Sequence, residues 1–298
     1  MKFGISYNTA YYGTDPGAMA AVARHAEACG FESFYVPEHI ALYPGASGGG
    51  FEFPPSLAVA DPLDCLSYVA AANERILLGT AVLLLPCHHP VILAKRLATI
   101  DLLSAGRMSL LTVGLGTLPG EAQALGVDFE ARGRRADEAI DVLRLLWAGD
   151  ETGVSYNGEF FSFTSLCSFP KPRQATTLPV HVGGSSRAAA RRAGRRGDGY
   201  FPGGRLTAAQ RASQLELMRA AAVEAGRDPA RLEYTRWGSA DLSPADVETH
   251  ARNGTTRLVV GLSSTDLTGQ LAELSAFAAR MNLTGAMPLP QAPARPAR

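Results

Sequence analysis

The stretch RILLGTAVLLLPCHHPVILAKRLATIDLLSAGRMSLLTVGLG (75–116) decides the fold class of this chain. It contains two apolar runs, 75–86 and 107–116, on either side of a segment, 90–106, whose apolar residues recur at helical spacing. Neither run alternates apolar with polar residues, which is typical of strands covered on both faces in a parallel sheet. The stretch therefore predicts a strand, a crossover helix and a second strand parallel to the first.

This unit of one strand and one helix recurs along the chain. We expect strands at 2–7, 33–37, 75–86, 107–116, 178–184, 198–202, 231–237 and 256–262. We expect helices at 15–30, 61–74, 90–106, 131–148, 185–196, 207–225, 244–252 and 266–281. Eight such repeats predict an α/β protein with a (β/α)8 TIM barrel, in one domain over residues 1–286. The alternative is an open doubly wound sheet.

Three segments fall outside the repeat. Asn157-Gly158, between alternating aromatic and polar residues, predicts a β-hairpin over 152–166. Residues 43–56 are rich in Gly and Pro, which predicts an irregular, mobile loop after the second strand. The Pro-, Ala- and Arg-rich segment 287–298 predicts a disordered tail.

Composition excludes several classes of protein. Lys plus Arg and Asp plus Glu number 28 each, so no net charge favours binding to nucleic acid or to a membrane surface. The four cysteines form no C-x-x-C pair, which argues against a zinc site and a disulfide framework. The longest apolar run is too short to cross a bilayer, and the N-terminus does not resemble a signal peptide. We expect a cytoplasmic protein with a small-molecule substrate and no metal.

Glycines and hydroxyls follow two of the predicted strands, at the carboxyl-terminal face where barrels carry their sites. Gly183 and Gly184 allow close approach of a ligand, and Ser185 stands at a helix N-terminus, where an anion is favoured. The alternative is that Ser185 only caps the helix. Gly114 and Gly116 similarly allow a flat ring or a phosphate to lie on backbone, unless they only make a β-to-α turn.

His39, at the end of the second strand, is the candidate acid or base, because imidazole titrates near neutral pH. The alternative is a structural histidine. Glu38 is expected to face the other way and to support His39, or to pair with an arginine. His88-His89 fits the start of a helix better than a metal site. The arginines at 191, 192, 195 and 196 suggest a solvated helix face or a site for a polyanionic ligand tail.

Several stretches together resemble the luciferase-like monooxygenase superfamily, in its branch of deazaflavin (coenzyme F420)-dependent oxidoreductases. They are KFGIS (2–6), CGFESFYVPEH (29–39), DPLDCLSYVAAANERILLGTAVLLLP (61–86), GRMSLLTVGLG (106–116), LGVDFEARGRRADEAIDVLRLLW (125–147), YNGEFFSF (156–163) and PVHVGGSSRAAARRAGRRGDGYF (179–201). The resemblance implies a barrel that binds F420, or alternatively FMN, at its carboxyl-terminal face, and a homo-oligomer, expected to be a dimer.

The resemblance also implies roles for individual residues. It places a non-prolyl cis peptide at Ala81-Val82 behind the cofactor ring, and it makes His39 the proton-transfer residue. The residues that it implies for cofactor binding are Ala81, Val82, Gly114, Gly116, Thr117, Gly183, Gly184 and Ser185. Tyr7, Glu38 and Phe201 are expected to contact substrate or to support residues that do. Leu118-Pro119-Gly120 separate Glu121 from the strand-end glycines, so Glu121 is given no role.

The implied function is hydride transfer between F420 and a small organic substrate. One alternative is a monooxygenase that uses reduced FMN, which would react with oxygen instead. A second alternative is a protein that binds flavin without catalysis.

Overall fold

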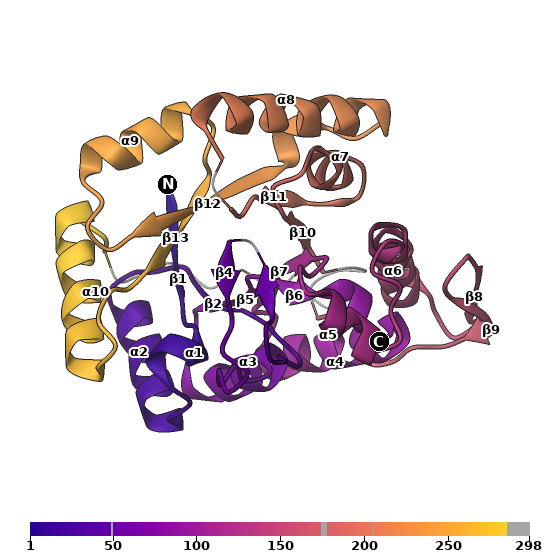
Figure 1. Ribbon diagram of the computed structural model, residues 1–298, viewed down its shortest axis with the longest axis horizontal. Coiled ribbons are helices and arrows are strands. Elements are labelled where there is room, and N and C mark those ends of the chain that lie inside the picture. Colours follow the sequence, from indigo (N-terminus) through magenta and orange to yellow (C-terminus); the bar gives the residue numbers. More distant parts are fainter. Residues whose placement is uncertain (49, 174–177, 205, 285–298) are drawn as a thin grey trace, which may run out of the picture.

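The computed structural model describes residues 1–48, 50–173, 178–204 and 206–284, and Figure 1 shows its ribbon. Within these residues eight parallel strands form a closed ring, because β7 pairs with β10 and β13 pairs with β1. In order around the ring they are β1 (Lys2–Ser6), β2 (Ser33–Val36), β5 (Leu77–Thr80), β7 (Met108–Gly114), β10 (Val180–Gly183), β11 (Gly199–Phe201), β12 (Glu233–Ser239) and β13 (Arg257–Gly261). The prediction of a (β/α)8 barrel is confirmed, and the open sheet is wrong.

Helices surround the strands in an outer layer (Figure 1). The main ones are α2 (Pro16–Ala28), α3 (Pro62–Ala72), α4 (Pro90–Leu103), α6 (Arg132–Ala148), α7 (Arg187–Arg196), α8 (Ala208–Glu224), α9 (Pro244–Arg252) and α10 (Leu267–Met281). Two of them begin at an Asp-Pro pair. The carboxylate of Asp15 accepts from the Ala18 amide at 2.6 Å, as its predicted role of N-cap requires. Proline fits the next position because its missing N–H would have no partner there.

The predicted strand 75–86 is interrupted. β5 ends at Thr80, the Ala81–Val82 peptide bond is cis, and pairing with β7 resumes in β6 (Leu83–Leu84) before the short helix η1 (Leu85–Cys87). The Thr80 hydroxyl donates to the Thr112 carbonyl at 2.7 Å and accepts from the Thr112 amide at 3.0 Å. These two bonds continue the contact with β7 next to the interruption. The cis bond implied by the resemblance is confirmed.

Smaller elements fill the connections. The predicted hairpin is confirmed as β8 (Val154–Asn157) and β9 (Ser162–Leu166). The loop 43–56 is not irregular throughout, because β3 (Ser47–Gly48) and β4 (Phe51–Glu52) pair in it. Short helices that were not predicted are α1 (Thr9–Tyr12), α5 (Pro119–Ala124) and η2 (Pro229–Arg231). The predicted tail 287–298 lies outside the described residues.

Charged side chains fill the end of the barrel interior at which the strands begin. Arg257 is 1% exposed, and its Nε donates to Glu32 at 2.8 Å while Nη1 donates to Glu233. His181 is also buried, with Nε2 3.8 Å from Glu233. Burial by itself would raise the pKa of Glu233, but Arg257 lowers it to about 2, so the carboxylate stays ionised. The network closes this end of the barrel.

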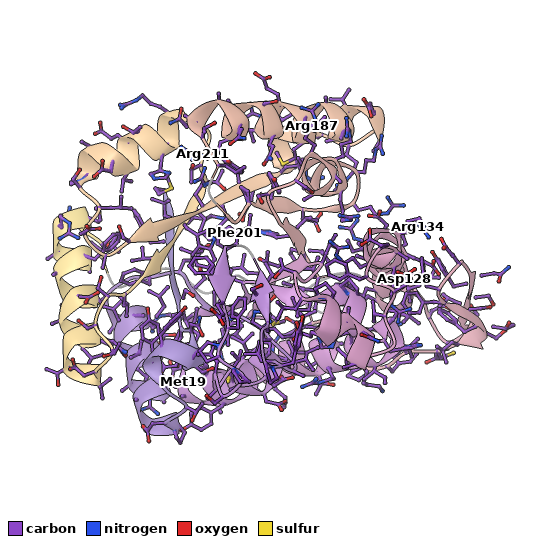
Figure 2. The ribbon with its side chains drawn as sticks, in the orientation of Figure 1. Met19, Asp128, Arg134, Arg187, Phe201 and Arg211 are labelled. Atoms are coloured by element: carbon purple, nitrogen blue, oxygen red, sulfur yellow. The ribbon has the colours of Figure 1, made fainter. Side chains whose placement is uncertain are left out.

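An aromatic layer lies above this network. The ring centroids of Tyr35 and Phe201 are 6.0 Å apart, and Trp237 lies 4.7 Å from Phe201. Figure 2 shows Phe201 in the middle of the ring of strands. The cavity described below lies beyond these two layers, where the strands end. No helix in the described part of the chain is long and apolar enough to cross a membrane.

We expect His181 to make folding stability depend on pH. Burial lowers the pKa of His181 to about 4, against 6.5 in an unfolded chain. Between these values the unfolded chain binds a proton that the folded protein does not, so stability falls as the pH drops from 6.5 to 4. The loss is roughly 3 kcal/mol over the window.

Urea unfolding at pH 7, 5.5 and 4.5 measures this loss. His181→Gln should flatten the decline relative to wild type, whereas His25→Gln, which changes a histidine on the outside of the barrel beside Ser275, should not. Parallel pH profiles for wild type and His181→Gln would contradict the assignment.

Candidate active site

A cavity of about 430 Å³ opens where the parallel strands end. Its wall is formed by segments that follow β1, β2, β5, β7 and β10. It includes these residues predicted from the sequence: Glu38, His39, Ala81, Val82, Gly114, Gly116, Thr117, Gly183, Gly184 and Ser185. The structure thus brings residues that are up to 147 positions apart in sequence (185 minus 38) to one site. Whether they bind a cofactor stays a prediction.

Val82, directly after the cis bond, packs into the space left by two glycines. A Cβ at Gly183 would lie 2.6 Å from Val82 Cγ1, and a Cβ at Gly114 would overlap Val82 Cγ2. Any larger residue at either position would therefore displace the Val82 side chain. The glycines of β7 and β10 are required here by close packing against Val82, which forms the back of the cavity.

One end of the cavity suits an anion. Ser186 caps α7, accepting from the Ala189 amide at 3.0 Å, so the cap is not Ser185. The Ser185 hydroxyl has no hydrogen-bond partner among the described residues and stands at the N-terminus of that helix. Arg132 lines the same cavity; its Nη1 donates to the Phe129 carbonyl, and its Nε is buried with no hydrogen-bond partner among the described residues. A guanidinium nitrogen with no partner, in the same cavity as a free hydroxyl and a helix N-terminus, is suited to a phosphate group.

Gln214 of α8 holds the backbone at the end of the cavity that suits an anion. Its Nε2 donates to the Ser185 carbonyl at 2.5 Å, and its Oε1 accepts from the Tyr200 hydroxyl at 2.7 Å. The Tyr200 hydroxyl also lies 3.0 Å from the Gly184 carbonyl, which accepts from it. The Gly184–Ser185 turn is therefore held by two buried side chains from neighbouring elements.

His39 pairs with Glu121 at another part of the cavity wall. His39 Nδ1 lies 3.2 Å from Glu121 Oε2, and Glu121 Oε1 accepts from the amides of Ile40 and Ala41 at 2.6 and 3.1 Å. Burial raises the pKa of Glu121, but His39 and the two amides together lower it below its ordinary value. An ionised Glu121 accepts the Nδ1 proton of His39, which leaves Nε2 available for proton exchange.

Glu38 does not support His39, and it pairs with no arginine of the described residues. Its carboxylate accepts from the Leu84 amide at 2.6 Å and lies 3.0 Å from Nε2 of His88. Glu38 therefore anchors the segment after the cis bond, rather than the histidine beside it. His89 begins α4, with Nδ1 accepting from the Val91 amide at 3.4 Å. Among the described residues no group of His, Cys, Asp or Glu side chains is suited to hold a metal.

Comparison with known proteins agrees with this geometry. Residues 1–296 match the luciferase-like monooxygenase family. The chain belongs to that family.

Two relatives and one solved structure show the extent of the likeness. An uncharacterized protein of Mycobacterium tuberculosis is 37% identical over 190 residues, which are 61% of this chain and 65% of that relative. An F420-dependent glucose-6-phosphate dehydrogenase of Microbacterium testaceum is 32% identical over 205 residues, 67% of this chain and 56% of that enzyme. The match thus spans less than two thirds of either relative. The structure of an F420-dependent secondary alcohol dehydrogenase in complex with an F420-acetone adduct has a TM-score of 0.75 at 19% identity, covering 95% of this chain and 99% of that one.

Tyr7 and Phe201 of this luciferase-like protein do not line the cavity. Phe201 lies below it in the aromatic layer and is 2% exposed. Tyr7 is fully buried, with its hydroxyl 3.4 Å from the Gly13 carbonyl and its ring stacked on Phe34. Neither side chain is therefore placed to contact a substrate in this cavity. The end of β1 instead contributes Asn8 and Tyr11 to the cavity.

The arginines of α7 are partly solvated, as expected of a helix face, because Arg191 and Arg195 are exposed, but three of the four are also held in ion pairs. Arg192 and Arg196 of α7 pair with Asp137 and Asp141 of α6 at 2.6 and 3.0 Å. Arg195 pairs with Glu224 of α8 at 3.2 Å. These pairs join α7 to the helices on both sides of it.

Glu121, Arg132 and Gln214 are functional candidates that the sequence did not indicate. Glu121 lies in the first turn of a helix that begins at Pro119, so its position in the sequence indicates a helix start and not a site residue. Arg132 stands among other arginines in a helical segment, and nothing in that pattern distinguishes it. Only the folded arrangement shows that Arg132 lines the cavity and that Glu121 contacts His39 of its wall.

Gly183→Ala should damage the cavity without altering its polar groups. The added methyl group would displace Val82, and overpacking of this kind costs roughly 1–3 kcal/mol. Gly203→Ala is the matched control, because a Cβ there meets no atom within 4 Å. Chemical denaturation of both variants checks the prediction. Equal stabilities of the two variants would contradict the packing of Val82 against β10.

Proposed function

We propose that this chain is an oxidoreductase that binds coenzyme F420 in this cavity and transfers a hydride between it and a small organic substrate. The single observation that carries the proposal is the juxtaposition, in one cavity, of an anion-binding end and a histidine held by an ionised carboxylate. The named activity of the Microbacterium relative and the F420 complex of the structural neighbour support the choice of cofactor.

The residues present fit a flavin-like cofactor with a phosphate group. Val82 and the adjoining glycines present a close-packed surface to a flat ring, and Ser185 with Arg132 offers unused donors to a phosphate. When bound, a deazaflavin supplies a carbon centre that gives or takes a hydride. The protein's own contribution is then to hold the substrate near that centre, to exclude water and to handle the accompanying proton.

We assign to His39 the transfer of the proton that accompanies the hydride. Glu121 accepts from Nδ1 and fixes the orientation of the ring, so Nε2 is the atom that exchanges a proton with substrate. Phe53 packs on the His39 ring at a centroid distance of 4.8 Å and limits its movement.

His39→Ala should lower kcat by about 10²-fold or more, the usual contribution of a general acid or base, with little change in the affinity for F420. Glu121→Gln keeps the shape of the partner but removes its charge, so we expect a smaller loss of kcat. Turnover is measured with whichever compound wild type accepts from a panel of secondary alcohols, sugar phosphates and quinones. His25→Ala, on the outer surface, is the control. Unchanged kcat in His39→Ala would remove His39 from the mechanism.

F420 should bind more tightly than FMN, and the complex with reduced F420 should not consume oxygen. Anaerobic fluorescence titration with each cofactor, followed by admission of air, measures both properties. Arg132→Met should weaken F420 binding about tenfold or more through loss of a phosphate contact. Arg134→Met is the matched control, because Arg134 lies on the same helix but is exposed and paired with Glu159.

Either of two outcomes would contradict the proposal and favour another function. Selective binding of FMN with oxygen consumption by the reduced complex would make the protein a flavin monooxygenase. Binding of a flavin without turnover of any compound in the panel would favour a non-catalytic flavin-binding protein.

A further inference from the structure

A second cavity, of about 370 Å³, lies on the outside of the barrel between α8 and α9. Its base is the outward face of β12, and Arg211, in the first turn of α8, lies at the end of that helix nearest to α9 (Figure 2). It is lined by Ala208, Arg211, Ala212, Leu215, Glu216, Arg219, Tyr234, Arg236, Thr249, His250, Arg252, Asn253, Gly254 and Thr255. None of these residues lines the candidate active site.

The cavity wall carries far more positive than negative charge. Arg211, Arg219, Arg236 and Arg252 line it, against Glu216 as the acidic residue in the same lining. In the part of the chain that the structure describes, Glu216 forms no ion pair, and the one pair made by these arginines joins Arg252 to Glu248 at 3.7 Å. The positive charges on the other three guanidinium groups are therefore not neutralised by a protein carboxylate within ion-pair distance.

Two neighbouring polar atoms buried in the base of the cavity make no hydrogen bond of good geometry to any residue that the structure describes. They are the hydroxyl of Tyr234, a residue 3% exposed, and Nε of Arg236. Burial lowers the pKa of Arg236, the neighbouring Tyr234 side chain raises it, and the charge of Arg211 lowers it further. Buried donors without a partner are uncommon in folded proteins, because each one costs free energy that a bound acceptor would recover.

We propose that the α8/α9 cavity binds a small organic anion that carries a phosphate or a carboxylate group. Arg211 and Arg236 bind its charged group from α8 and β12, and the Tyr234 hydroxyl donates to it from below. Guanidinium groups suit both kinds of anion, because each offers two parallel donors. The space exceeds the needs of a bare ion, and Ala208, Ala212 and Leu215 provide an apolar surface for the body of the ligand.

The test uses calorimetric titration of the cofactor-free protein with pyrophosphate and with citrate, at constant ionic strength. These probes distinguish phosphate from carboxylate recognition. The variant Arg211→Met with Arg236→Met should lose about tenfold or more in affinity for at least one probe. The matched control, Arg191→Met with Arg231→Met, removes the same charge from exposed positions outside the cavity and should bind as wild type does.

Arg132→Met separates this cavity from the candidate active site. Binding to the α8/α9 cavity should persist in Arg132→Met, whatever that change does to F420. If the Arg211/Arg236 variant binds both probes as tightly as wild type, or if Arg132→Met abolishes all binding, the proposal is wrong. The single variant Arg211→Met, at a half-buried position, gives the same comparison if the double variant unfolds. Failure of wild type to bind either probe would also overturn the proposal.

Discussion

A guanidinium group enclosed in the barrel determines which end of the barrel interior is filled and which end stays open. Arg257 is 1% exposed and lies between the carboxylates of Glu32, which directly precedes β2, and Glu233, which begins the neighbouring strand β12. A buried charge is tolerated only when it is paired and hydrogen-bonded, so these three side chains must stay together. They fill the end of the barrel at which the strands begin, and the layer of Tyr35 and Phe201 covers them. The opposite end is the one where the interior remains open.

The open end is shaped by the interruption of one strand. Pairing with β7 stops after β5 and resumes in β6, and Val82, between them, packs against Gly114 and Gly183. Glu38 then holds the resumed segment by accepting from the Leu84 amide. Glu38 and His39 are adjacent in sequence but have different roles. Glu38 holds a segment of the cavity wall, whereas His39 lines the cavity and contacts Glu121.

The sequence predicted the barrel well because its signal is local. Apolar runs of strand length, helical spacing and Asp-Pro helix starts each depend on residues close together in the chain. The glycine-rich strand ends are local signals too, and these residues are found around one cavity.

The partners of the polar side chains could not be predicted in the same way. His39 and Glu121 are 82 residues apart, and Glu38 and His88 are 50 residues apart. Which carboxylate reaches which histidine depends on how the strand ends and the following loops are placed in space, and no periodicity encodes that. The same reason explains Arg132, whose importance comes from a buried nitrogen without a partner.

Strand β12 connects the floor of the barrel to the cavity on its outer surface. Successive side chains of a strand point to opposite faces, so Glu233 joins the Arg257 network and Trp237 packs on Phe201 inside, while Tyr234 and Arg236 face α8 and α9 outside. A shift of one residue in the pairing of β12 would exchange these two sets. It would leave Arg257 without Glu233 and would move Arg236 into the barrel beside an existing guanidinium. The interior ion network therefore also fixes the register that presents Arg236 to the α8/α9 cavity.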